Sequence, residues 1–115
     1  MSIKIFHNPR CSKSRQTLQL LADNNVQAEI IEYLKQAPSK TELESILSLL
    51  GFSPRQLMRK GEAIYKELNL AEESLSDEQL LDAMLSNPIL IERPIVLANG
   101  KAAIGRPPES VLDII

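Results

Sequence analysis

The dipeptide Asn99-Gly100 constrains the fold more than any other short segment, because it separates two apolar runs at residues 94–98 and 101–104. Asn and Gly readily adopt the positive φ angles of a type I′ turn, and this pair between two apolar runs is the strongest short signal for a β-hairpin. The last third of the chain is therefore predicted to contain two antiparallel strands. The prolines at 107–108 then begin a final helix.

The N-terminal third predicts a strand, a helix and a second strand joined by short connections. Residues 3–6 and 28–34 are apolar runs of strand type. Between them, a helix capped by Ser12 or Ser14 is expected to run to about Asn25. Two strands joined through one helix are expected to pair in parallel with a right-handed crossover.

The middle of the chain is predicted to be helical. Ser39 and Ser76 each begin a capping box, in which Glu or Gln follows the serine three residues later, and leucines at helical spacing come after both. The pair at 53–54, Ser-Pro, begins a shorter helix, and Asn-Pro at 87–88 ends the last one.

The order of elements is therefore β-α-β, a helical block, then β-β-α. A chain of 115 residues is large enough for one hydrophobic core but not for two. This order is that of a thioredoxin/glutaredoxin-like α/β fold with a mixed sheet. We expect a single such domain over residues 1–115, with a helical insertion at about residues 39–86.

Charge and composition exclude several classes of function. The net charge of -2 argues against a nucleic-acid-binding domain, and 3% aromatic residues with no Trp give little support for stacking on bases or sugars. No apolar run approaches the roughly 18 residues of a membrane helix. The N-terminus lacks the layout of a signal peptide. We therefore expect a cytoplasmic protein that binds neither nucleic acid nor membrane.

The single cysteine, Cys11, falls between the first predicted strand and the first predicted helix. In α/β sheets this edge, beyond the carboxyl end of the strand, is where ligands usually bind. One cysteine forms neither an internal disulfide nor, alone, a zinc site, so any disulfide must involve an external thiol and we expect no metal. The alternative is a buried cysteine that packs as a small hydrophobic residue.

The surroundings of Cys11 favour a thiolate. The N-terminus of a helix offers free N–H groups and the positive end of the helix dipole. Arg10, Lys13 and Arg15 add positive charge, and a protonated His7 would add more. An ordinary thiol, with a pKa of about 8.5, is only a few per cent ionised at pH 7, and lowering that pKa by about two units takes roughly 2.7 kcal/mol. The same groups would attract a tetrahedral oxyanion.

Smaller roles are open for the neighbours of Cys11. His7 either supports Cys11 or is a hydrogen-bond donor of the loop. Ser14 either donates a hydrogen bond to the sulfur or, like Ser12, caps the helix.

Three arginines outside the loop stand out. Arg93 precedes the hairpin and Arg106 follows it, each beside a proline that fixes the backbone. Because a hairpin returns its two ends to one edge of the sheet, these arginines are expected to lie near each other. Arg59 ends a short helix of the insertion. The alternative for each is a solvated arginine or a surface ion pair. Pro94 is predicted to follow a cis peptide bond, as the proline opposite the active cysteine does in thioredoxin-like folds.

Residues 7–15, His-Asn-Pro-Arg-Cys-Ser-Lys-Ser-Arg, resemble the active-site loop of the glutaredoxin-coupled arsenate reductases. The segments at 57–60, 65–70, 87–96 and 105–107 also match that family, in the same order. The resemblance covers essentially the whole chain. It is especially close to the short branch of the family, often labelled arsenate-reductase-like.

The resemblance implies an arsenate reductase in which the Cys11 thiolate attacks the arsenic of arsenate. Arg59, Arg93 and Arg106 would hold the oxyanion. It implies no bound cofactor: glutathione would be a co-substrate, and glutaredoxin would resolve a Cys11–glutathione disulfide. We expect a monomer whose partners are arsenate or a similar oxyanion, glutathione and glutaredoxin. The supporting residues would be His7, Asn8, Ser14, Arg15 and Pro94.

Three other functions remain open. The protein could be an oxidoreductase of glutathione mixed disulfides, although three arginines favour a small oxyanion. A second class with this fold binds RNA polymerase as a redox-sensitive regulator. Such regulators typically carry Cys-x-x-Cys in this loop, whereas this chain has Ser14 at the second position. The third is an oxyanion-binding protein without turnover.

Overall fold

The computed structural model describes residues 3–115. Contacts between residues divide the chain into two compact units. The first, here called the sheet unit, consists of the described residues up to Gln36 together with Arg93–Ile115, and the second, the helical unit, is Ala37–Glu92. The single domain over residues 1–115 stays a prediction.

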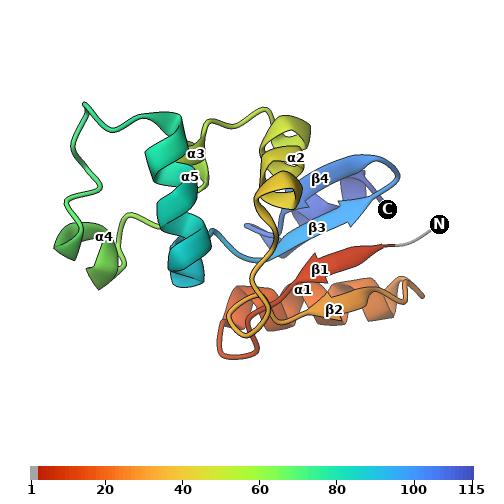
Figure 1. Cartoon of the computed structure of the whole chain (residues 1–115). Coiled ribbons are helices and arrows are strands. Elements are labelled where there is room, and N and C mark those ends of the chain that lie inside the picture. The colour runs from red at the N-terminus through yellow and green to blue at the C-terminus, as the bar shows by residue number, and fades with distance from the viewer. Residues whose placement is uncertain (1–2) are drawn as a thin grey trace. The chain divides into compact units, whose positions relative to one another are not determined.

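The sheet unit contains a four-stranded mixed sheet of order β2-β1-β3-β4 (Figure 1). Strand β1 (Lys4–Phe6) pairs in parallel with β2 (Glu29–Ile31), and α1 (Ser12–Asp23) joins the two along the chain. Strand β1 also pairs antiparallel with β3 (Ile95–Ala98), which pairs antiparallel with β4 (Lys101–Ile104). The predicted mixed sheet, with β-α-β before the helices and a hairpin after them, is confirmed.

The turn of that hairpin has the predicted geometry. Asn99 and Gly100 both have positive φ angles, 54° and 71°, as a type I′ turn requires. The Asn99 side chain also donates a hydrogen bond of 2.6 Å to the carbonyl oxygen of Ile114. The final helix is the 3₁₀ helix η2 (Pro108–Asp113). The hairpin and the C-terminal segment are thus tied together within the sheet unit.

The core of the sheet unit lies between the sheet and the helices α1 and η2, which pack against each other. The register places Ile5 of β1 opposite Ile30 of β2 and opposite Val96 of β3. Burying one such aliphatic side chain contributes roughly 1.5–3 kcal/mol. This core fixes the first strand and the first helix, and therefore the loop that carries Cys11. Its buried members are Ile5, Leu21, Val96, Ala98, Val111 and Ile114.

The start of α1 differs from the prediction. Its N-cap is Cys11, which has an extended backbone (φ -93°, ψ 124°) and whose carbonyl oxygen accepts a hydrogen bond of 3.0 Å from the Arg15 N–H. Neither Ser12 nor Ser14 caps the helix, since both lie inside it. The prediction was wrong because the Ser14 hydroxyl has other partners in the preceding loop.

The helical unit contains α2 (Lys40–Leu50), α3 (Pro54–Leu57), α4 (Ala63–Glu67), α5 (Asp77–Ser86) and the 3₁₀ helix η1 (Pro88–Leu90). Helix α5 contacts α2, α3 and η1. The predicted caps are confirmed: the hydroxyl oxygens of Ser39 and Ser76 accept hydrogen bonds from the N–H groups of Glu42 and Gln79. The buried side chains of this unit include Leu43, Ile46, Leu57, Leu80, Met84 and Leu90.

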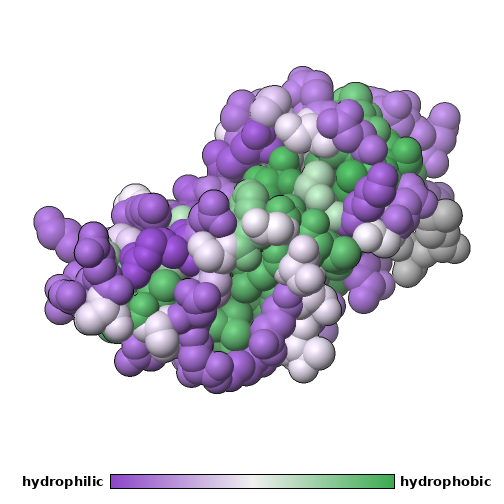
Figure 2. All heavy atoms as spheres, turned by 90° about the horizontal axis from the view of Figure 1, so that it is seen from above, coloured by the Kyte–Doolittle hydropathy of each residue, from purple (hydrophilic) through white to green (hydrophobic). Residues whose placement is uncertain are grey.

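Apolar as well as polar side chains reach the surface (Figure 2). Ile30 and Leu112 in the sheet unit and Leu49 and Leu68 in the helical unit are exposed. More than half of a typical protein surface is apolar, so single exposed side chains of this kind support no functional argument. Among residues 3–115, no helix combines the length and the apolar character needed to cross a bilayer.

Candidate active site

The loop that precedes Cys11 is held by hydrogen bonds at both ends. The His7 N–H donates to the Ile31 carbonyl oxygen (2.8 Å), which ties the loop to the end of β2. The buried Asn8 accepts from the Cys11 N–H with its carbonyl oxygen and from the Arg10 N–H with Oδ1, each at 3.0 Å. These bonds close a turn that presents Cys11 at the start of α1.

Ser14 connects the buried side of the loop to α1. Its fully buried Oγ accepts from the Asn8 N–H (3.0 Å) and lies 2.6 Å from Nδ1 of His7. The group of Ser14 that hydrogen-bonds the Cys11 sulfur is the backbone N–H, not the hydroxyl that we considered from the sequence. Arg15 adds a further bond across the loop, from Nη1 to the Pro9 carbonyl oxygen (3.0 Å).

His7 is too buried to supply positive charge at neutral pH. Burial lowers its pKa, the Glu32 carboxylate raises it, the Arg15 guanidinium lowers it, and the net pKa is below the usual value. The possibility of a protonated His7 beside Cys11 is therefore corrected, because the residue is only 6% exposed. His7 acts on the loop as a neutral hydrogen-bond partner of Ser14.

Replacing His7 with Asn is expected to reduce the loss of stability as the pH falls from about 7.5 to about 5.5. Since the pKa of His7 is lowered by folding, the unfolded chain takes up the proton first. The stability linked to a neutral His7 is thus complete above pH ~6.5 and declines below it, by about 1.4 kcal/mol for each unit of pKa lowering.

Urea denaturation of both proteins at the two pH values measures this effect. His7 is the only histidine of the chain, so the difference between wild type and H7N isolates its titration. Parallel losses of stability in the two proteins would contradict a buried, neutral His7.

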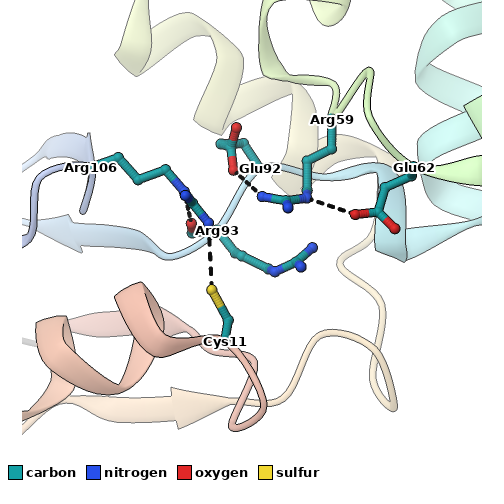
Figure 3. Close-up of polar contacts among 6 residues, drawn as sticks. All are labelled: Cys11, Arg59, Glu62, Glu92, Arg93 and Arg106. Atoms are coloured by element: carbon teal, nitrogen blue, oxygen red, sulfur yellow. Dashed lines mark hydrogen bonds and ion pairs between the residues drawn. The ribbon is translucent and has the colours of Figure 1, made fainter.

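The two arginines that flank the hairpin both lie beside the Cys11 sulfur, and Figure 3 draws the contact of Arg106 with it. Arg106 donates from Nη2 to Cys11 Sγ (3.4 Å) and from Nε to the carbonyl oxygen of Arg93 (2.8 Å). The Arg93 side chain also hydrogen-bonds the sulfur. The expected proximity of Arg93 and Arg106 is confirmed. The Arg93–Pro94 peptide bond is cis, as predicted, and so is Arg106–Pro107, which the sequence did not indicate.

The surroundings of Cys11 lower the pKa of its thiol. Burial on its own raises that pKa, because it disfavours the charged form. The Ser14 N–H, the Arg93 side chain and the Lys13 N–H lower it by hydrogen bonding, the Arg93 charge lowers it further, and the net direction is downward. The sequence pointed to the neighbouring side-chain cations. The structure adds Arg93, which lies far away along the chain, and the backbone N–H groups of the helix start.

Arg59 belongs to the helical unit, where two carboxylates hold its guanidinium (Figure 3). Nε lies 3.1 Å from Glu62 Oε2 and Nη1 lies 2.7 Å from Glu92 Oε1. Burial lowers the pKa of Arg59, but the two carboxylates raise it and determine the net direction. The ion pair that we left open from the sequence is therefore present, and a role in binding an oxyanion stays a prediction.

Among residues 3–115, no group of three or more His, Cys, Asp or Glu side chains is arranged to hold a metal ion. The chemical groups of the site are thus a thiol with a lowered pKa, two guanidinium groups and the N–H groups at the start of a helix. Together they can stabilise a thiolate and the negative charge of an anion beside it.

Comparison with known proteins confirms the family resemblance. Residues 6–114 match the model of the ArsC family. A protein of Escherichia coli K12 called "Uncharacterized protein YfgD" is 58% identical over 114 residues, which are 98% of this chain and 96% of that protein. An arsenate reductase of Neisseria meningitidis (strain MC58) is 52% identical over 110 residues, 95% of this chain and 94% of the relative.

A solved structure of similar sequence shows the same fold. The structure titled arsenate reductase from Vibrio cholerae superimposes with a TM-score of 0.97 at 51% identity, over 100% of this chain and 98% of that one. The match of the family model to nearly the whole chain, and relatives that share half of its residues, establish that the chain belongs to the ArsC family and has its thioredoxin-like fold.

Proposed function

We propose that the protein is an arsenate reductase in which Cys11 is the nucleophile. The observation that carries the proposal is the contact of Arg106 with the Cys11 sulfur at 3.4 Å, beside Arg93, at the start of a helix. A thiolate and a tetrahedral anion require the same surroundings, namely positive charge and free N–H groups. The names of the Neisseria and Vibrio relatives support arsenate as the anion.

In the proposed reaction the Cys11 thiolate attacks As(V), a sulfur–arsenic bond forms, and an arsenate oxygen leaves as water after protonation. A glutathione thiolate then attacks the Cys11 sulfur. The sulfur–arsenic bond breaks with its electron pair on arsenic, so As(V) is reduced to As(III), arsenite leaves, and the two sulfurs become a disulfide. Glutaredoxin reduces that disulfide and regenerates the thiolate. An external thiol is required because Cys11 is the only cysteine of the chain.

The side chains have different parts in this proposal. Arg93 and Arg106 neutralise the anion and the charge that develops on it, as donors aimed at an oxyanion do. A role for Arg59 in holding the oxyanion remains a prediction from the sequence. Asn8, Ser14 and Arg15 hold the loop, with the neutral His7 bonded to Ser14, and Pro94 sets the backbone next to Arg93. The absence of a bound cofactor, the monomeric state and the cytoplasmic location remain predictions.

A coupled assay with arsenate, glutathione and glutaredoxin tests the function. We expect arsenite to form only when both thiol components are present. The matched reaction replaces arsenate with a mixed disulfide of glutathione and a small thiol. Turnover of the mixed disulfide without any formation of arsenite would contradict the proposal and favour an oxidoreductase of glutathione mixed disulfides.

A further inference from the structure

We propose that Gly105 is a positioning residue for the Cys11 site: the missing side chain at this position lets Arg106 reach the sulfur. This inference rests on the proposed function. It starts from the segment between β4 and Arg106, where Gly105 is buried and its N–H donates a hydrogen bond of 3.0 Å to the carbonyl oxygen of Pro94.

A side chain at Gly105 would collide with two fixed groups. A Cβ atom there would lie 2.3 Å from Oγ1 and 3.1 Å from Cγ2 of Thr17, and 2.8 Å from Cγ of Pro94. Non-bonded carbon atoms prefer separations of about 3.5–4.0 Å. Unlike Gly51 and Gly100, Gly105 does not have a positive φ angle, so close approach of the backbone is what requires glycine here.

Both groups that contact Gly105 are linked to the Cys11 site, Thr17 through α1 and Pro94 through Arg93. Thr17 lies in α1, is fully buried, and donates from Oγ1 to the carbonyl oxygen of Lys13 (2.8 Å). The N–H of Lys13 in turn hydrogen-bonds the Cys11 sulfur. Displacement of Thr17 would therefore also displace the first turn of α1, which hydrogen-bonds the sulfur.

The contact with Pro94 would displace the segments that carry Arg93 and Arg106. Pro94 directly follows Arg93, whose carbonyl oxygen accepts the hydrogen bond from Arg106 Nε. Arg106 directly follows Gly105 and reaches Cys11 Sγ with Nη2 at 3.4 Å. Because hydrogen bonds weaken steeply with distance and angle, a shift of a few tenths of an ångström between α1 and this segment would weaken the contact between Arg106 and the sulfur. Gly105 thus sets the distance between the cysteine and its guanidinium partners.

The test compares G105A with a glycine-to-alanine change that meets no obstacle. Gly61 serves as the control, because its added Cβ would have nothing within 4 Å and its φ is not positive. The measurement is the rate of alkylation of Cys11 by iodoacetamide as a function of pH, with circular dichroism to establish that each variant is folded. We expect alkylation of G105A at pH ~6.5 to be roughly threefold to tenfold slower than that of the wild type, as for partial loss of a hydrogen bond to a charged group. G61A should keep the wild-type profile.

A second variant keeps the proposal testable if G105A does not fold. T17A/G105A removes the Oγ1 and Cγ2 atoms of Thr17 and leaves only the contact with Pro94. We expect the double variant to fold. Its rate of Cys11 alkylation should lie between the rates of the wild type and G105A, or between those of the wild type and R106A if G105A cannot be measured. Folded G105A with the wild-type alkylation profile would overturn the proposal, as would a folded double variant with that profile when G105A is unfolded.

The alkylation profile does not depend on arsenate. If G105A has the wild-type alkylation profile while the wild type forms arsenite, the role of Gly105 is refuted and the proposed function is not. A shifted profile in G105A, with no arsenite formed by the wild type, would refute the proposed function and keep Gly105 as the residue that positions Arg106.

Discussion

The C11S variant is expected to form no arsenite above the background rate while it keeps the fold. A serine hydroxyl is not ionised at neutral pH, so the donors around position 11 have no thiolate to stabilise. The protein should not lose stability, because Cys11 is the N-cap of α1 and a serine hydroxyl there can accept the hydrogen bonds that the Ser14 and Lys13 N–H groups donate to the sulfur. Serine is among the preferred N-cap residues and would add up to about 1 kcal/mol.

Two measurements separate the expected result from misfolding. The coupled assay gives the rate of arsenite formation, and urea denaturation gives the free energy of unfolding of C11S. Stability equal to or above that of the wild type, together with loss of turnover, assigns the chemistry to the sulfur. Arsenite formation by C11S at a rate close to that of the wild type would remove Cys11 from the mechanism.

The R106A variant is expected to bind arsenate about 10- to 150-fold more weakly. This range corresponds to 1.5–3 kcal/mol for hydrogen bonds to a charged group. Arg106 is exposed, and its hydrogen bonds of known geometry go to the Arg93 carbonyl oxygen and to Cys11 Sγ, so its loss should affect the site more than the fold. R106K keeps the charge but not the planar fork that spans both acceptors, and we expect an intermediate affinity.

Titration calorimetry with arsenate measures these affinities without reaction when all variants also carry C11S. K101A is the matched control, since Lys101 is an exposed cation of the neighbouring strand β4. Its arsenate affinity should equal that of C11S alone. An unchanged affinity in R106A would exclude Arg106 from the oxyanion site.

Much of the fold follows from signals within a few residues of each other. Asn99 and Gly100 specify their turn locally, because both adopt positive φ angles. The hairpin then brings Arg93 and Arg106 together without further information, which is why their proximity could be predicted. The caps Ser39 and Ser76 are equally local, and their helices begin where the sequence indicates.

Competition between partners is what the sequence does not reveal. Ser14 is a good capping residue, yet its hydroxyl is bonded to Asn8 and His7, and Cys11 becomes the N-cap. The charge of His7 depends on its burial, which no spacing of residues indicates. The same holds for Arg59, since its partner Glu92 lies 33 residues further along the chain.

Close approach of backbones is also invisible in a single sequence. Gly105 has neither a turn signal nor a positive φ, and its importance follows only from its separation from Thr17 and Pro94. Thr17 is 88 positions before Gly105 in the chain. Residues of this kind join elements that are far apart in sequence, so the geometry of the site could be predicted only where a hairpin or a helix start creates it.

The rate of Cys11 alkylation across the pH range, measured with and without arsenate, tests the central claim most directly. We predict that the pKa of the wild-type thiol lies below the ordinary value of a free cysteine, about 8.5. We also predict that arsenate slows alkylation by occupying the site beside the sulfur. The lowered pKa follows from the hydrogen bonds of Ser14, Arg93 and Lys13 to that sulfur. An ordinary thiol profile that arsenate leaves unchanged would contradict both the thiolate and the anion site.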